Sequence, residues 1–197
     1  GVPRPATAEG PTSHAWWGVA VLLAVAGMLY GCLVFAHFFL WTVSPAQWPA
    51  ATALPELRSP VVSAGLYVAS SLLIMAADRG IGRGRNALAG LLVLVAVPLL
   101  LSAVALDGWS HFDAGLRPQA SGYGATVFTM VALQGFYAFT LTVMAMFTLA
   151  RAIAARLDPR RRASFDSMRM IWHFVVIQGL AGLAIVTGFP RLLGALS

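Results

Sequence analysis

Five long stretches of this chain contain no Asp, Glu, Lys or Arg. They cover residues 10–55, 59–77, 86–106, 118–150 and 170–190. A helix that crosses a bilayer needs about 20 apolar residues, so each stretch can supply one crossing. Only 10% of the 197 residues are charged and 59% are hydrophobic, whereas an ordinary soluble domain has about 25% charged residues. The sequence therefore predicts an all-α membrane protein with five transmembrane helices.

The predicted helices leave little of the chain for anything else. We place them at residues 16–43, 60–77, 86–106, 124–154 and 170–193. They form one domain, 16–197, after an N-terminal segment, 1–15, and the connections are too short to hold a soluble catalytic domain. Pro98 predicts a kink in the third helix. The segment 44–55, with Pro45 and Trp48, predicts an irregular loop at the membrane interface.

The arginines predict the orientation of the chain. All 13 basic residues are arginine, and ten of them lie on the side that carries the N-terminus and segments 78–85 and 151–169. By the positive-inside rule the N-terminus is cytoplasmic and the C-terminus lies outside. The net charge of +6 therefore reflects membrane topology rather than nucleic-acid binding. Arg160, Arg161 and Arg162 are expected to anchor at anionic lipid headgroups, although the acidic surface of a partner would attract the same charges.

Histidines are candidates for chemistry inside the membrane, because ionisable residues there are costly and often functional. His37 and His173 fall near opposite ends of their helices, roughly 25 Å apart in depth at about 1.5 Å per residue, so one haem cannot join them. We expect each to form hydrogen bonds between helices. The alternative is a haem or metal site, held by His173 together with His14 or by His37 together with His111. The single cysteine, Cys32, cannot form a disulfide within this chain or hold a thiolate-bound cluster.

Acidic residues are absent from the five predicted helices. A proton pump needs a chain of carboxylates or histidines across the membrane, so this polypeptide alone is not expected to pump protons. Four residues at the end of the third helix are expected to lie in an exposed loop with local hydrogen bonds, and a metal or proton-collecting site is the alternative. They are Asp107, Trp109, His111 and Asp113.

Polar and small residues predict how the helices pack. A broken polar stripe runs along the fourth helix through Thr126, Thr129, Gln134, Tyr137 and Thr140. Gln178 adds an amide on the fifth helix, and such side chains commonly form hydrogen bonds between helices. The pairs Gly27 with Gly31 and Ala184 with Gly188 have the small-residue spacing that lets helices approach. We expect packing within this chain, and contact with a partner subunit is the alternative.

Two short motifs resemble those of a known family. Residues 122–128 (GYGATVF) and 134–137 (QGFY) resemble the YGSxFF and GFHGLH signature of subunit III of haem-copper respiratory oxidases, and residues 172–175 (WHFV) resemble its WHFVD motif. The aromatic stretch 35–41 and the Pro and Trp residues at 45–49 are similar to further parts of the family. The resemblance covers nearly the whole chain and implies the last five of the family's seven helices. It implies a structural role for Tyr123, Gly124, Gln134, Tyr137, Trp172, His173 and Phe174.

Several charged or histidine positions of the family differ in this sequence. The family's buried Glu corresponds to Gly31 or a neighbour, and the two histidines of GFHGLH correspond to Tyr137 and Thr140. The Asp that follows WHFV in the family is Val176 here. The resemblance therefore implies packing and assembly more than proton chemistry.

The resemblance implies a cofactor-free accessory subunit in the bacterial inner membrane. Its partner would be an oxidase catalytic subunit that holds the haems and copper and reduces oxygen to water with electrons from cytochrome c or quinol. Bound phospholipid and stabilisation of the catalytic subunit, within a proton-translocating respiratory complex, are the implied roles. Two alternatives stay open, an accessory subunit of a nitric oxide reductase and a small transporter or membrane haem protein.

Overall fold

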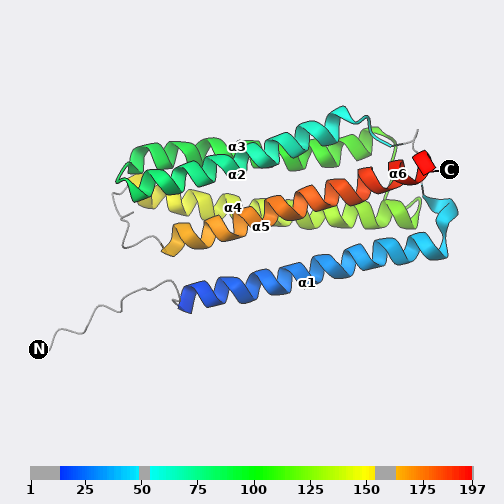
Figure 1. Cartoon of the computed structure of the whole chain (residues 1–197), viewed down its shortest axis with the longest axis horizontal. Coiled ribbons are helices and arrows are strands. Elements are labelled where there is room, and N and C mark those ends of the chain that lie inside the picture. The colour runs from blue at the N-terminus through cyan, green and yellow to red at the C-terminus, as the bar shows by residue number, and fades with distance from the viewer. Residues whose placement is uncertain (1–13, 49–53, 154–162, 197) are drawn as a thin grey trace, which may run out of the picture.

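The computed structural model describes residues 14–48, 54–153 and 163–196, which form a set of long, roughly parallel helices (Figure 1). They are α1 (His14–Val43), α2 (Arg58–Gly82), α3 (Asn86–Asp113), α4 (Gly122–Ile153) and α5 (Ala163–Leu183), continued by the π-helical segment η3 (Ala184–Gly188) and by α6 (Phe189–Leu196). No strand occurs in these described ranges. Five helical segments are long and apolar enough to cross a membrane. The predicted all-α fold with five spans is therefore confirmed, whereas its orientation stays a prediction.

Two of the helices extend further than predicted at the end of the bundle where the arginines gather. α2 continues to Gly82 and α5 begins at Ala163, so the connecting segments are shorter than the predicted 78–85 and 151–169. Asp78 on α2 and Arg169 on α5 form an ion pair with an N–O distance of 2.5 Å. Both helices therefore continue through charged residues, and pairing lowers the cost of these two charges near the membrane.

The opposite end of α3 also differs from its prediction. The helix continues to Asp113, so the expectation of an exposed loop at residues 107–113 is wrong. Asp107 and His111 are one turn apart on the same helix, and His111 Nε2 lies 3.4 Å from Asp107 Oδ1. Because side chains four residues apart meet on one helix face, this pair stabilises the last turns of α3. The helix also continues through Pro98 without interruption.

The core lies between α2, α3, α4 and α5. Buried residues recur at intervals of three and four on each helix, which places them on one face, as in coiled-coil packing. On α3 this face carries Ala89, Val93, Ala96, Leu100 and Ala103. The small side chains let α2 and α3 pack closely along their length.

α1 lies at the edge of the bundle, against α4 and α5 (Figure 1). Of its described side chains only Ala26 and His37 are buried. Only 6% of its most apolar stretch is covered by the rest of the chain, against 50% for the span that begins at Ala163. α1 therefore presents most of its apolar surface to its surroundings.

Aromatic contacts tie the last helix to α1. The Phe189 ring of α6 packs edge-on against Phe38 and Trp41, each with ring centroids 5.0 Å apart. Arg191 donates hydrogen bonds to the carbonyl oxygens of Thr187 and Pro55. After α1 the chain forms a short 3₁₀ turn, η1 (Pro45–Gln47), within the segment predicted to be irregular, of which residues 49–53 lie outside the described ranges.

Candidate functional site

Two buried amides form the centre of a polar network between α4 and α5. Gln134 Nε2 donates to the carbonyl oxygen of Val175 at 2.8 Å, and Gln178 Nε2 donates to Gln134 Oε1 at 3.2 Å. Both glutamines are about 5% exposed or less. Hydrogen bonds of this kind hold transmembrane helices together, so the predicted interhelical role of these two side chains is confirmed.

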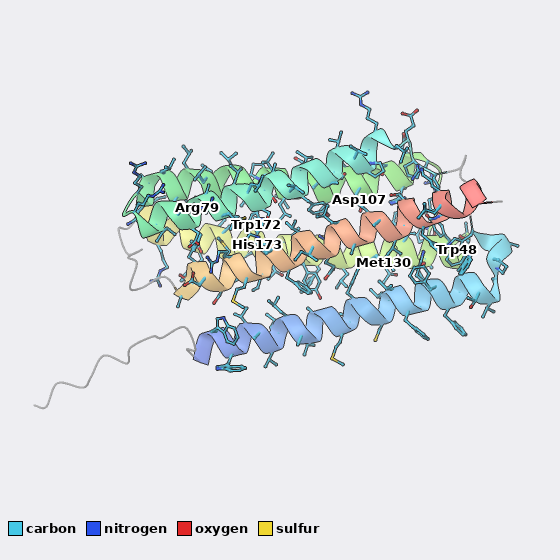
Figure 2. All side chains as sticks on the ribbon, in the orientation of Figure 1. Trp48, Arg79, Asp107, Met130, Trp172 and His173 are labelled. Atoms are coloured by element: carbon cyan, nitrogen blue, oxygen red, sulfur yellow. The ribbon has the colours of Figure 1, made fainter. Side chains whose placement is uncertain are left out.

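A small cavity with a mixed polar and apolar lining lies beside the two amides, where α1, α3, α4 and α5 meet. Its volume is about 20 Å³. The lining residues are Tyr30, Asp107, His111, Met130, Val131, Gln134, Gln178, Gly179, Gly182 and Val186. Figure 2 shows Asp107 and Met130 in the same part of the bundle, away from Trp172 and His173.

The cavity contains the acidic residue that the sequence prediction placed in a loop. Asp107 has a side chain only 15% exposed and its partner His111 only 2% exposed. Two further polar atoms of the lining, the hydroxyl of Tyr30 and Oε1 of Gln178, are buried without a hydrogen-bond partner among the described residues. Sequence reasoning missed this site, although the spacing of four between Asp107 and His111 was a usable signal.

The π-helical segment η3 forms one edge of this cavity through Val186. A π-helix disturbs the regular hydrogen-bond ladder and is often found at functional sites. Here the Tyr123 hydroxyl of α4 donates to the carbonyl oxygen of Val186 at 3.0 Å. Tyr123, a predicted framework residue, therefore fixes the position of the π-helical segment.

Tyr123 also borders a fully buried histidine. His37 Nδ1 lies 2.8 Å from the Thr126 hydroxyl, so the expected interhelical hydrogen bond of His37 is confirmed. The rings of Trp48 and Tyr123 surround it, with centroid distances of 5.1 and 5.6 Å. The site is an aromatic enclosure between α1, α4 and the turn after α1, and it joins three segments.

The second motif makes contacts to α2 nearer the arginine-rich end. Trp172 Nε1 donates to the Ser70 hydroxyl at 3.2 Å, and His173 Nδ1 lies 2.7 Å from the Ser71 hydroxyl. The expected hydrogen bond of His173 to another helix is thus confirmed. Two consecutive motif residues bind two consecutive serines, which fixes the register between α5 and α2.

Phe174, the third residue of this motif, reaches the opposite side of α5. Its ring meets that of Tyr137 on α4 edge-on at 6.3 Å. A Cβ added at Gly27 would lie 3.7 Å from the Phe174 ring, which is an ordinary packing distance. Gly27 therefore contributes to packing of α1 on α5.

The other small residues of the predicted spacing do not make close contacts in the chain. A Cβ at Gly31 or at Gly188 would meet nothing within 4 Å, and Ala184 is exposed. Among the described residues, close packing of these three positions against another helix is therefore not observed. Contact with a partner subunit stays a prediction.

The threonines of α4 also differ from expectation. Thr129 and Thr140 donate to the carbonyl oxygens of Ala125 and Phe136 in their own helix. A hydroxyl can bond the preceding turn in this way when no partner faces it, so these two residues do not join helices. Thr126 is the exception, because it also meets His37.

Gly124 is required by the approach of the preceding loop. A Cβ at this position would lie 2.3 Å from the carbonyl oxygen of Arg117, which is far inside contact distance. The backbone amide of Gly124 donates a hydrogen bond to the Ser121 hydroxyl at 3.0 Å. The glycine of the first motif therefore positions the start of α4.

In the described part of the chain, no group of three or more His, Cys, Asp or Glu side chains is placed so that it could hold a metal ion. The side chain of His14 and the three arginines Arg160, Arg161 and Arg162 lie outside the described residues. Their predicted roles stay predictions. Comparison with protein families and with curated proteins finds no match to this chain.

Proposed function

We propose that this protein is a cofactor-free accessory subunit of a haem-copper terminal oxidase, similar to subunit III, in the bacterial inner membrane. The observation that carries the proposal is that residues of the two motifs form hydrogen bonds between helices. Tyr123, Gln134, Trp172 and His173 each form a hydrogen bond with a helical segment other than their own. These hydrogen bonds support the proposal, because the resemblance implies a framework role for the motif residues.

The proposed mechanism is support of a catalytic partner. The partner subunit would hold the haems and copper and reduce oxygen to water, while this chain stabilises it and binds phospholipid at the shared surface. Arginines near the membrane attract anionic headgroups, and Arg160, Arg161 and Arg162 are the proposed anchors. The hydrogen bonds that join α5 to α2 and to α4 would help to keep the docking surface in one shape.

α1 supports this proposal because it exposes large apolar side chains. Phe35 is 72% exposed, Met28 73% and Val25 59%. In a membrane such a surface is covered by lipid or by a neighbouring helix, and close packing against a partner adds van der Waals contact. We therefore propose α1 as part of the surface that faces the catalytic subunit.

Gentle extraction of the tagged full chain in mild detergent tests the proposal. Mass spectrometry of the co-migrating proteins and an absorbance spectrum of the complex give the partner and its cofactors. We expect an oxidase catalytic subunit, with haem absorbance that stays with that subunit when the complex is dissociated. A nitric oxide reductase catalytic subunit would replace the proposal by its alternative, and a haem band in the isolated chain would overturn it.

Variants connect this experiment to the structure. Trp172→Ala removes the contact of α5 with Ser70 and is expected to reduce recovery of the catalytic subunit. Thr129→Ala is the control, because its hydroxyl bonds only its own helix. Equal recovery with both variants would contradict the proposed framework role of Trp172.

A further inference from the structure

The cavity beside Gln178 brings together polar side chains from four different helical segments, among apolar ones. Tyr30 comes from α1, Asp107 and His111 from α3, Gln134 from α4, and Gln178 from α5. Each lies within a segment long and apolar enough to cross a membrane. Polar groups gathered in such surroundings are costly unless they have partners.

The donors and acceptors around the cavity complement one small polar molecule. The Tyr30 hydroxyl can donate, Gln178 Oε1 can accept, and neither has a partner among the described residues. Gln178 is only 4% exposed, and its Nε2 is already bonded to Gln134. The Asp107 carboxylate adds acceptors, and His111 adds a ring nitrogen. A water molecule, with two hydrogens and two lone pairs, can bond all of these kinds of group.

The volume of the cavity limits the size of the ligand that it can hold. A site needs about 10–15 Å³ to hold one water molecule, and this cavity has about 20 Å³. This space has the size that one or two water molecules occupy. Cavities lined only by apolar side chains stay dry, whereas a cavity with two to four polar partners holds ordered water.

We propose that this cavity is an internal water site, in which one or two water molecules bridge Tyr30 and Gln178 to the Asp107–His111 pair. The bound water links α1 and α3 to the Gln134–Gln178 network of α4 and α5. It also solvates the Asp107 carboxylate, which reduces the cost of an acidic residue on the inner face of a membrane helix. The site is a property of this chain alone and does not depend on the proposed oxidase partner.

Two buried methionines provide a matched internal comparison for the test. Met130 lines the cavity and is 4% exposed, whereas Met168 is 0% exposed and belongs to the apolar core. A short X-ray pulse converts bound water to hydroxyl radicals, which oxidise the nearest side chains. We expect Met130 to be oxidised several-fold faster than Met168 in the purified full chain, measured by mass spectrometry of peptides.

A cavity-filling variant tests the position of the water. A Cβ at Gly182 would lie 3.2 Å from the Tyr30 hydroxyl, so Gly182→Ala combined with Tyr30→Phe puts a methyl group beside the place of that hydroxyl and removes one polar partner of the water. We expect the oxidation of Met130 to fall toward that of Met168. Gly135→Ala is the control, because a Cβ there meets nothing within 4 Å, and it should leave the ratio unchanged.

Rapid mixing into heavy-oxygen water before the pulse adds a second readout. The oxygen incorporated at Met130 should carry the heavy isotope once the internal water has exchanged with bulk water. Equal oxidation of Met130 and Met168 in the unmodified chain would overturn the proposal, whatever partner the chain binds. Unchanged oxidation of Met130 in a folded Gly182→Ala/Tyr30→Phe variant would also overturn it.

Discussion

The indole nitrogen of Trp172 on α5 donates a hydrogen bond to the Ser70 hydroxyl on α2, at 3.2 Å, and both residues are fully buried. Trp172→Phe removes this donor and keeps most of the aromatic volume. We expect the free energy of unfolding to fall by about 1 kcal/mol, the size of a typical hydrogen bond between membrane helices. Thermal unfolding in detergent measures the change. Trp109→Phe, at a side chain 67% exposed, should leave stability unchanged.

Gly124→Ala is expected to destabilise the start of α4. The new methyl group would overlap the carbonyl oxygen of Arg117, and backbone atoms have to move to relieve the overlap. Inserting a methyl group into a tightly packed site typically costs about 1–3 kcal/mol. Thermal unfolding compared with Gly135→Ala, where a Cβ has free space, measures the difference. Equal melting temperatures for the two variants would contradict the close approach of Arg117.

Gln134 and Gln178 are expected to be coupled energetically. Gln134→Leu leaves the Gln178 amide without its acceptor in an apolar environment, so we expect a loss of about 1–2 kcal/mol. Gln134→Leu/Gln178→Leu removes both partners and should cost less than the sum of the two single variants. A double-mutant cycle of unfolding in detergent tests this, and additivity would show that the two amides do not interact.

The ion pair between Arg169 and Asp78 is expected to contribute little to stability. The two side chains are 32% and 23% exposed, and Arg169 also lies 3.8 Å from Asp166. Partly exposed pairs contribute about 0–1 kcal/mol and are screened by salt. Asp78→Asn should therefore lower the melting temperature slightly at low ionic strength and not at high ionic strength. A large fall in the melting temperature of Asp78→Asn that persists at high salt would show that the pair is neither weak nor screened.

The arginine distribution predicts which end of the bundle faces the cytoplasm. In a Cys32→Ser background, Gln119→Cys places an exposed thiol at the end with few arginines, and Arg83→Cys places one at the arginine-rich end. A membrane-impermeant maleimide applied to intact cells should label Gln119→Cys. Arg83→Cys should react only after the membrane is opened. The reverse pattern would show that the N-terminus lies outside.

The number and positions of the helices were predictable because length and apolarity alone decide a membrane crossing. The helix faces that are buried in the protein were not predictable. Apolar side chains occupy all sides of each helix, so the sequence does not distinguish a face that meets lipid from a face that meets protein. α3 illustrates the problem: Leu91 and Leu94 are exposed, whereas Ala96 and Ala103 are buried. Small residues at intervals of seven were the usable signal for the inner face.

Of the polar sites, the two histidine hydrogen bonds were predicted and the site around Asp107 was not. The hydrogen bonds of His37 and His173 were expected because imidazoles in hydrocarbon need partners. Asp107 was placed in a loop because a charge normally ends a transmembrane helix. The packing of α1, α4 and α5 around Asp107 leaves its side chain only 15% exposed, and the sequence does not show this packing.

The π-helical segment Ala184–Gly188 has a consequence for the rotation of the chain that follows it. A π-turn holds about one more residue than an α-turn, and one residue corresponds to about 100° around the helix axis. Phe189 and Arg191 therefore point in directions that a continuous α-helix would not give them. Deleting one residue from this segment would turn Phe189 away from Trp41 and Arg191 away from Pro55. A change of one residue within this segment would therefore rotate α6 about its axis, whereas the contacts of α5 before Ala184 would stay the same.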